Sequence, residues 1–225
     1  MDYNSIAGDY HKHIEKDLNE DKLQRELIEL VGIHNPEGWE ILDVGCGSGI
    51  QTNFLAKRFP EIKQLVGVDS SKELIRIAND TSKDKRCSYT VGDMHALPLE
   101  DGQFNFIFSR YAVHYSNAMD KVMSELHRVC KPDGQIFVQV VHPIYELFKK
   151  PSKNYEIPEE ADFVAQTTKV KIRHLTHTIP EYINGAIEAG LRLVNIEEMF
   201  SEQSNIDGYR VPTVLILRMQ KPAEA

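Results

Sequence analysis

Apolar runs and amphipathic stretches alternate along most of the chain. The runs are short and mostly apolar, which predicts buried β-strands. Stretches with apolar residues at helical spacing lie between them and predict helices. The predicted strands fall near residues 40–45, 64–69, 87–91, 104–109 and 135–141, and the predicted helices near residues 49–59, 71–80 and 117–130. A further helix is predicted over Lys22–Val31, before the first strand.

The last part of the chain returns to this pattern after an interruption. A helix is predicted near residues 180–189, with Gly190 as its C-terminal stop, and strands follow near residues 191–197 and 211–219. Alternating strands and helices joined by short loops favour a parallel sheet that is covered on both faces. We therefore expect an α/β fold with a Rossmann-like, seven-stranded, mostly parallel sheet and helices on both of its faces.

The interruption covers residues 142–178, which contain several prolines and aromatic residues without a clear periodicity. Within it, Lys169–Arg173 alternates as a strand would, with basic residues on what we interpret as a solvated face. The segment follows the fifth strand at the edge of the sheet where ligands bind in such folds. We interpret it as an inserted substrate lid, and residues 1–35 as an N-terminal helical cap. The whole chain, residues 1–225, is predicted to be one domain.

The turn after the first predicted strand is rich in glycine. Asp43–Gly49 reads Asp-Val-Gly-Cys-Gly-Ser-Gly, and these glycines allow positive φ and close approach of a ligand, although an ordinary βα turn has the same appearance. The second strand ends in Asp69, 20 residues after Gly49, where nucleotide-binding units place the carboxylate that accepts ribose hydroxyls. Ile50 replaces the third glycine of a dinucleotide fingerprint, which argues against NAD.

These two segments and three later ones resemble the class I S-adenosylmethionine (SAM)-dependent methyltransferases, in particular the small-molecule branch called type 11. The resemblance is collinear over most of the chain. The matching segments are Asp43–Gly49, Val66–Ser71, Val91–Leu99, Phe104–Ser109 and Glu125–Gly134. The resemblance implies that SAM is the cofactor and that S-adenosylhomocysteine (SAH) is its product.

The same resemblance implies roles for individual residues. Asp43 would orient the methionine amino group, and Asp69 would hold the ribose. Asp93 would accept a hydrogen bond from the adenine amine, next to the backbone N–H of Met94. For Asp43 and Asp93 the alternative is an ordinary acid in a turn. The full set of implied cofactor-binding residues is Asp43, Gly45, Cys46, Gly47, Gly49, Asp69, Ser70, Asp93, Met94, Ser109 and Tyr10.

Catalysis leaves less trace in the sequence. The methyl group of a sulfonium is already activated, so transfer needs alignment, desolvation and, for many acceptors, the removal of one proton. The candidate bases are His114, after the fourth strand, and His142, at the end of the fifth, with lining of the pocket or packing as the alternative for each. His174 and His177 are weaker candidates, and His95 is interpreted as a surface or structural residue. The predicted substrate-facing residues are Tyr3, Tyr111, Tyr115 and Tyr145.

Charge and cysteine content narrow the choice of partners. The chain has 34 acidic residues against 26 Lys and Arg, for a formal net charge of −8, and this balance disfavours a nucleic acid partner. The first residues contain no apolar signal region, and no run approaches the ~20 apolar residues of a membrane segment. We therefore expect no membrane partner. Three cysteines without paired spacing favour reduced thiols in a cytoplasmic protein. No acid cluster follows Ser109 or His142, so we expect no metal.

The sequence therefore predicts a cytoplasmic, metal-independent, SAM-dependent methyltransferase that modifies an oxygen or nitrogen of a small molecule. Two alternatives stay open at this point. One is a methyltransferase for a tRNA or a protein, and the other is a SAM-binding module without turnover. A monomer and a homodimer are both compatible with the sequence.

Overall fold

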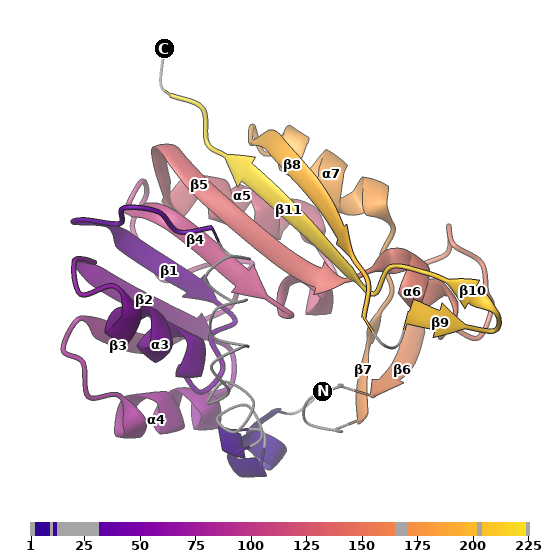
Figure 1. Cartoon of the computed structure of the whole chain (residues 1–225), viewed down its shortest axis with the longest axis horizontal. Coiled ribbons are helices and arrows are strands. Elements are labelled where there is room, and N and C mark those ends of the chain that lie inside the picture. The colour runs from indigo at the N-terminus through magenta and orange to yellow at the C-terminus, as the bar shows by residue number, and fades with distance from the viewer. Residues whose placement is uncertain (1–2, 10, 13–31, 165–170, 202–203, 224–225) are drawn as a thin grey trace.

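The computed structural model describes residues 3–9, 11–12, 32–164, 171–201 and 204–223 (Figure 1). The helix predicted over Lys22–Val31 and the cofactor contact predicted for Tyr10 lie outside the described residues. Among the helices within the described ranges, none is both long and apolar enough to cross a membrane.

A seven-stranded sheet forms the centre of the fold, in the order β3-β2-β1-β4-β5-β11-β8. Its strands are β1 (Glu40–Val44), β2 (Gln64–Asp69), β3 (Cys87–Val91), β4 (Phe104–Arg110), β5 (Cys130–Val141), β8 (Arg192–Met199) and β11 (Val214–Gln220). The first five are parallel, and β11 is antiparallel to β5 and β8. This confirms the predicted sheet. β11 begins at Val214 rather than at residue 211, since Pro212 has no N–H to donate to a neighbouring strand.

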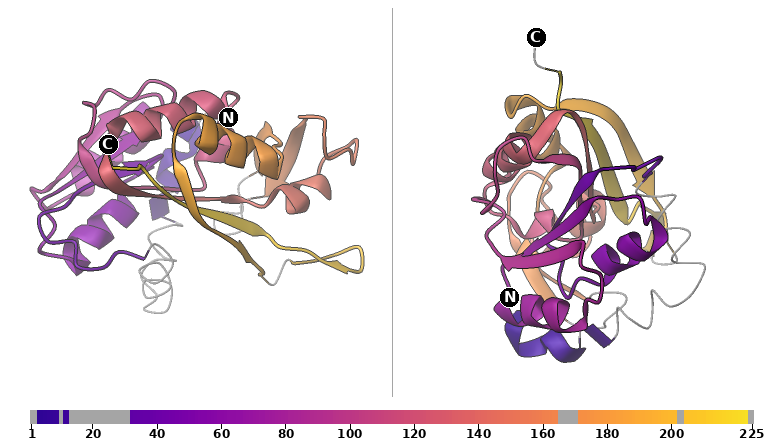
Figure 2. Two further views of the ribbon diagram at one scale, coloured as in Figure 1. Left: turned by 90° about the horizontal axis from the view of Figure 1, so that it is seen from above. Right: turned by 90° about the vertical axis from the view of Figure 1, so that its left-hand side faces the viewer.

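Helices cover both faces of the sheet (Figure 2). They are α3 (Ile50–Arg58), α4 (Lys72–Thr81), α5 (Met119–Val129) and α7 (Ile179–Glu188). Alternate residues of β1 point to opposite faces, so each contributes to a different part of the core. Ile41 belongs to the cluster that contains Leu55 of α3, whereas Leu42 belongs to the cluster that contains Leu126 of α5. The core is thus split by the sheet, as the alternating pattern predicts.

Residues 142–178 contain more regular structure than their sequence pattern indicates. They include α6 (Pro143–Leu147) and an antiparallel hairpin of β6 (Glu160–Val164) and β7 (Lys171–Leu175), which we call the lid hairpin (Figure 1). The expectation of a segment without periodicity is corrected here. Each of these elements is five residues long, which is too short for a helical or strand period to stand out. The role of the segment as a substrate lid stays a prediction.

The first described residues pack at the carboxyl edge of the sheet. The 3₁₀-helix η1 (Tyr3–Ile6) lies against α4, where Asn4 Oδ1 accepts from the Ser71 hydroxyl at 2.9 Å and from the Glu73 backbone N–H at 3.1 Å. A second short 3₁₀-helix, η2 (Val113–Tyr115), follows β4, and a small hairpin of β9 (Asn205–Ile206) and β10 (Tyr209–Arg210) precedes β11. The sequence-predicted cap and the turn after β2 are therefore in contact.

Candidate functional site

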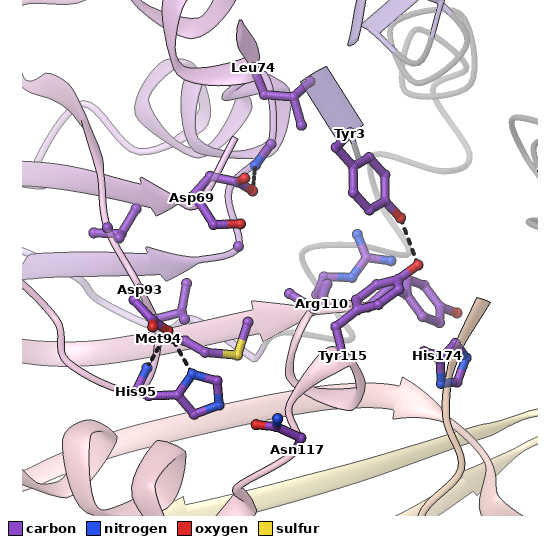
Figure 3. Close-up of a pocket in the computed structure, with 18 of the residues that line it drawn as sticks. Tyr3, Asp69, Leu74, Asp93, Met94, His95, Arg110, Tyr115, Asn117 and His174 are labelled. Atoms are coloured by element: carbon purple, nitrogen blue, oxygen red, sulfur yellow. Dashed lines mark hydrogen bonds and ion pairs between the residues drawn. The ribbon is translucent and has the colours of Figure 1, made fainter. Parts of the chain in front are cut away.

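A cavity of about 510 Å³ opens at the carboxyl edge of the sheet, where β1, β2 and β4 end (Figure 3). Parallel α/β sheets bind ligands along this edge. One wall comes from the turns after β1, β2 and β3, which we call the turn wall. The opposite wall comes from η1, from the turn after β4 and from β7 of the lid hairpin, and we call it the lid wall. Residues far apart in the sequence therefore share one cavity.

The glycine turn after β1 has the backbone that its sequence predicts. Gly45, Gly47 and Gly49 have φ values of 76°, 55° and 74°, which residues with a Cβ rarely adopt. A Cβ on Gly45 would lie 2.1 Å from the Cβ of Ala112, so this glycine permits close packing of the turns after β1 and β4. Gly45 and Gly47 line the cavity. Gly49 instead packs against the ring of Tyr89 at the start of α3.

Asp69 lines the cavity at the end of β2, next to Ser70. Its Oδ2 accepts from the Gly47 backbone N–H at 2.9 Å, and its Oδ1 accepts from the Ser71 N–H at 2.9 Å. Burial raises the pKa of Asp69, and the backbone N–H groups act against this rise. The carboxylate is therefore fixed in place by main-chain donors, and each oxygen retains a lone pair for a ligand hydroxyl.

Asp43 is buried at 3% exposure at the end of β1, where its Oδ2 accepts from the Thr52 hydroxyl at 2.6 Å. Burial raises the pKa of Asp43 to about 7. Asp43 and Cys46 line a small pocket that neighbours the main cavity, and the side chain of Arg110 lines both. Ser109 lines neither, and its hydroxyl donates to the Val44 carbonyl at 2.8 Å.

Asp93 and Met94 line the cavity in the turn after β3, as the sequence predicts (Figure 3). Asp93 Oδ1 accepts from the backbone N–H of His95 at 2.9 Å and lies 2.6 Å from the ring Nδ1 of the same residue. These contacts, the backbone one first, hold the pKa of Asp93 below its ordinary value. His95, which the sequence indicates as structural, also lines the cavity.

Of the four tyrosines predicted to face substrate, three line the cavity: Tyr3, Tyr111 and Tyr115. The hydroxyls of Tyr3 and Tyr115 lie 2.6 Å apart and join η1 to the turn after β4 (Figure 3). Tyr111 has a positive φ of 54°, an uncommon backbone for a bulky residue and one that often occurs at functional sites. Tyr145 on α6 is outside the cavity lining, and its ring lies 5.4 Å from Lys149 Nζ.

Neither candidate base lines the cavity. His114 is 1% exposed, and its ring packs 4.4 Å from that of Tyr115 and 4.7 Å from that of His174. Burial lowers the pKa of His114 well below its ordinary value, so its ring is neutral. His142 caps α6: its Nδ1 accepts from the Ile144 N–H at 3.0 Å, and its Nε2 lies 3.0 Å from Glu198 Oε1. Both nitrogens of His142 are thus engaged in the fold, which argues against a catalytic role for it.

The lid wall contains residues that the sequence does not indicate as site residues. Arg110 lines the cavity because β4 extends one residue beyond Ser109. Arg173 and His174 line it from β7, the strand whose alternation is visible in the sequence but is typical of a solvated face. Asn117 lies in the loop before α5. Only the alternation of β7 carries a signal for these positions, because contact between the lid hairpin and the sheet has no local pattern.

Comparison with known proteins agrees with this geometry. Residues 42–138 match the sequence model of a family described as a methyltransferase domain. A demethylmenaquinone methyltransferase of Lactococcus lactis subsp. lactis is 28% identical over 163 residues, which cover 68% of this chain and 62% of the relative. A malonyl-(acyl-carrier protein) O-methyltransferase of Legionella pneumophila is 29% identical over 145 residues, which cover 62% of this chain and 51% of the relative. The chain thus spans between half and two thirds of the length of these curated relatives.

The fold is shared with solved structures. The crystal structure of a SAM-dependent methyltransferase from Mesorhizobium loti has a TM-score of 0.71 at 20% identity, over 87% of this chain and 97% of that one. At this identity the likeness concerns the fold. Residues 42–138 of this chain therefore match a methyltransferase domain, and the chain has the fold of SAM-dependent methyltransferases of known structure.

Proposed function

We propose that this chain transfers the methyl group of SAM to an oxygen or nitrogen of a small-molecule acceptor. The observation that carries the proposal is the arrangement of three acids at the ends of neighbouring parallel strands: Asp69 and Asp93 line the main cavity, and Asp43 lines the small pocket beside it. Their order across the strands β1, β2 and β3 matches the order of methionine, ribose and adenine along SAM. Asp43 would receive the methionine ammonium, Asp69 the ribose hydroxyls and Asp93 the adenine amine.

The residues present fit SAM. Because Gly45 and Gly47 have no side chain, a ligand can approach their backbone beside Asp69. Ser70 and Met94 line the cavity where the ribose and the adenine would lie. Asp43 is a buried carboxyl group whose raised pKa an ammonium partner would lower again. SAM supplies a sulfonium methyl that is already activated, so the protein has to align the acceptor, exclude water and accept the acceptor's proton or pass it to solvent.

The lid wall supports an organic acceptor. Tyr3, Tyr111 and Tyr115 present aromatic surface to the cavity, and Asn117 and His174 add polar groups. The two relatives are named for different acceptors, demethylmenaquinone and malonyl-(acyl-carrier protein), so their names do not identify the acceptor of this chain. The lid role of residues 142–178, the cytoplasmic location, independence from metals and the absence of a nucleic acid partner stay predictions.

Calorimetry with SAM and SAH tests the cofactor half of the proposal. We expect micromolar affinity, and we expect Asp69→Ala to weaken SAM binding by about 1.5–3 kcal/mol, the scale of hydrogen bonds to a charged group. Asp101→Ala is the matched control, because Asp101 is exposed and lies outside the cavity lining. Unchanged SAM affinity in Asp69→Ala would remove the ribose assignment.

A methyl-release assay over a panel of metabolites tests the catalytic half. Mass spectrometry of molecules that co-purify with the native protein would choose the panel. Transfer to a hydroxyl or amine of a small molecule is the expected result. Tight SAH binding without transfer to any panel member, to tRNA or to protein would instead indicate a binding module without turnover.

A further inference from the structure

The turn after β3 and the loop before α5 are joined by a chain of three polar side chains. Asp93 Oδ1 lies 2.6 Å from His95 Nδ1, and His95 Nε2 lies 2.8 Å from Ser116 Oγ. A carboxylate only accepts, so Nδ1 carries the ring proton and donates it to Asp93. In the neutral ring Nε2 is then the acceptor, and the Ser116 hydroxyl donates to it. The direction of every hydrogen bond in the chain follows from this one assignment.

The atoms have the order of an Asp-His-Ser hydrolase site, but the burial of the serine excludes that chemistry. Ser116 is 0% exposed, so no substrate carbonyl reaches its oxygen. Its Oγ also accepts from the Ala118 backbone N–H at 2.9 Å, at the start of α5. The hydroxyl is therefore a fixed anchor between His95 and the first turn of a helix, rather than a nucleophile.

The two ends of this chain of hydrogen bonds face different parts of the cavity. Asp93 contacts His95 through Oδ1 alone, and its side chain is 66% exposed. Its Oδ2 is therefore available to adenine. At the other end, Tyr115 and Asn117 flank Ser116, and both line the cavity. The side chains of His95 and Asn117 lie close together on this side of the cavity (Figure 3).

We propose that His95 is a positioning residue that orients Asp93 for adenine and ties this carboxylate to loop 115–118, so that cofactor binding orders the acceptor-facing residues Tyr115 and Asn117. The inference rests on the proposed function, since it assigns adenine to Asp93. An adenine amine that donates to Oδ2 restrains the carboxylate. That restraint passes through His95 to the Ser116 hydroxyl, and from there to the N–H of Ala118 at the start of α5.

Two variants and their combination test the inference by SAH calorimetry. His95→Ala removes the middle of the chain, and we expect it to weaken SAH binding about 10-fold, the scale of a hydrogen bond to a charged group. Ser116→Ala removes only the far end, and we expect a loss of about threefold. Because the three groups act as a unit, the double variant should bind SAH no more weakly than His95→Ala alone. His34→Ala, an exposed histidine outside the cavity lining, is the matched control.

Hydrogen exchange measures the coupling directly, and it distinguishes this role from a loss of fold. In the unaltered protein, SAH should slow amide exchange both at residues 45–49 and at residues 115–118. In each variant the slowing at 45–49 should persist, while that at 115–118 should vanish. Variants that keep the slowing at 115–118, or whose effects on SAH affinity add, would overturn the inference. Absence of SAH binding by the unaltered protein would overturn the proposed function itself, which is a different result.

Discussion

The two walls of the cavity differ in how their polar groups are satisfied. On the turn wall, Asp69 and Asp93 accept hydrogen bonds from backbone N–H groups, and Asp43, in the small pocket beside this wall, accepts one from the Thr52 hydroxyl. At the lid hairpin and in the core behind it, six buried polar atoms have no hydrogen-bond partner within the described residues, and of the residues that carry them only His174 lines the cavity. These atoms belong to His114, Glu146, His174, His177 and Tyr182.

This difference separates a preorganised side of the site from a side that is held at a cost to stability. The hydrogen-bonded acids are in place before a ligand arrives. A buried polar group without a partner costs about 1–3 kcal/mol, so the groups beneath the lid hairpin weaken the fold unless something else compensates them. Such groups are characteristic of sites where a ligand, a proton or a moving element completes the hydrogen bonding. We therefore expect rearrangement on binding at the lid wall and little at the turn wall.

The largest expected effect is that of Gly45→Ala, which tests how rigid the turn wall is. The new Cβ would lie 2.1 Å from the Cβ of Ala112, on a residue with a φ of 76°. Backbone strain and overpacking together should lower the free energy of unfolding by about 2–5 kcal/mol. Urea denaturation measures the loss. A loss below about 1 kcal/mol would mean that the turns after β1 and β4 move apart easily, and the turn wall would not be preorganised.

Gly102→Ala is the control for backbone strain. Gly102 also has a positive φ, of 59°, but no atom lies within 4 Å of the position that a Cβ would take there. This variant should lose about 1–2 kcal/mol, the cost of a left-handed backbone alone. The difference between the two variants then isolates the contact of Gly45 with Ala112.

The next effect concerns the dependence of stability on pH, which the groups beneath the lid hairpin should control. Burial raises the pKa of Glu146 from 4.5 to about 8, so the folded protein keeps a proton that the unfolded chain releases between these values. The free energy of unfolding should therefore fall as pH rises through this window. Burial lowers the pKa of His174 to about 4, so the unfolded chain takes up a proton below pH 6.5 that the folded protein does not. Stability should therefore also fall as pH drops from 6.5 to 4.

Glu146→Gln should remove the alkaline part of this decline, which amounts to at most about 1.4 kcal/mol for each unit of pKa shift. Urea denaturation between pH 5 and pH 9 measures it. The groups that face Glu146 are His174, with Nε2 at 3.7 Å, the His177 backbone N–H, and the charges of Lys150 and Glu181. Glu188→Gln, at an exposed position on α7, should leave the profile unchanged. Equal profiles in all three proteins would show that Glu146 is ionised in the fold.

A smaller effect is expected in the small pocket beside the turn wall, where Asp43 should make SAM binding depend on pH. Burial raises the pKa of Asp43 to about 7, and an ammonium group beside it favours the ionised form. SAM affinity should therefore rise with pH between about 5.5 and 7, by up to about 1.4 kcal/mol per unit, with release of a proton. Calorimetry in two buffers of different ionisation enthalpy measures this release. Asp43→Asn should abolish it, whereas Asp133→Asn, outside both pockets, should not.

The turn wall could be predicted from the sequence because its geometry is local. Gly45 and Gly47 follow a buried strand, and Asp69 and Asp93 end or follow the next two strands, so a linear pattern places all of them at one sheet edge. The backbone conformation and the strand order then bring these residues together. Their side chains need few contacts with distant parts of the chain, which is why a resemblance in short segments carries over to this wall.

The lid wall could not be predicted in the same way. The ring centroids of His174 and Tyr115 lie 5.3 Å apart, and His177 Nε2 lies 3.2 Å from the His114 carbonyl oxygen. Both contacts join segments about 60 residues apart in the sequence. No period or motif encodes such contacts, because the docking of the lid hairpin depends on tertiary packing. The role of His142 as a candidate base gained no support for a related reason: the end of β5 leads into α6, and this histidine is the helix cap.

The smallest expected effect is that of His142→Asn, which decides whether the turn after β5 takes part in the chemistry at all. Asparagine is a good N-cap, so the contact with the Ile144 N–H persists, and only the contact with the half-exposed Glu198 is lost. Unfolding free energy should fall by about 1 kcal/mol, the scale of one hydrogen bond, because Glu198 is half-exposed and water can replace the histidine at its carboxylate. With an acceptor from the metabolite panel, kcat should stay within about twofold. A fall of ~10² or more with intact SAM affinity, relieved at high pH, would instead make His142 the general base and move the catalytic centre away from the lid wall.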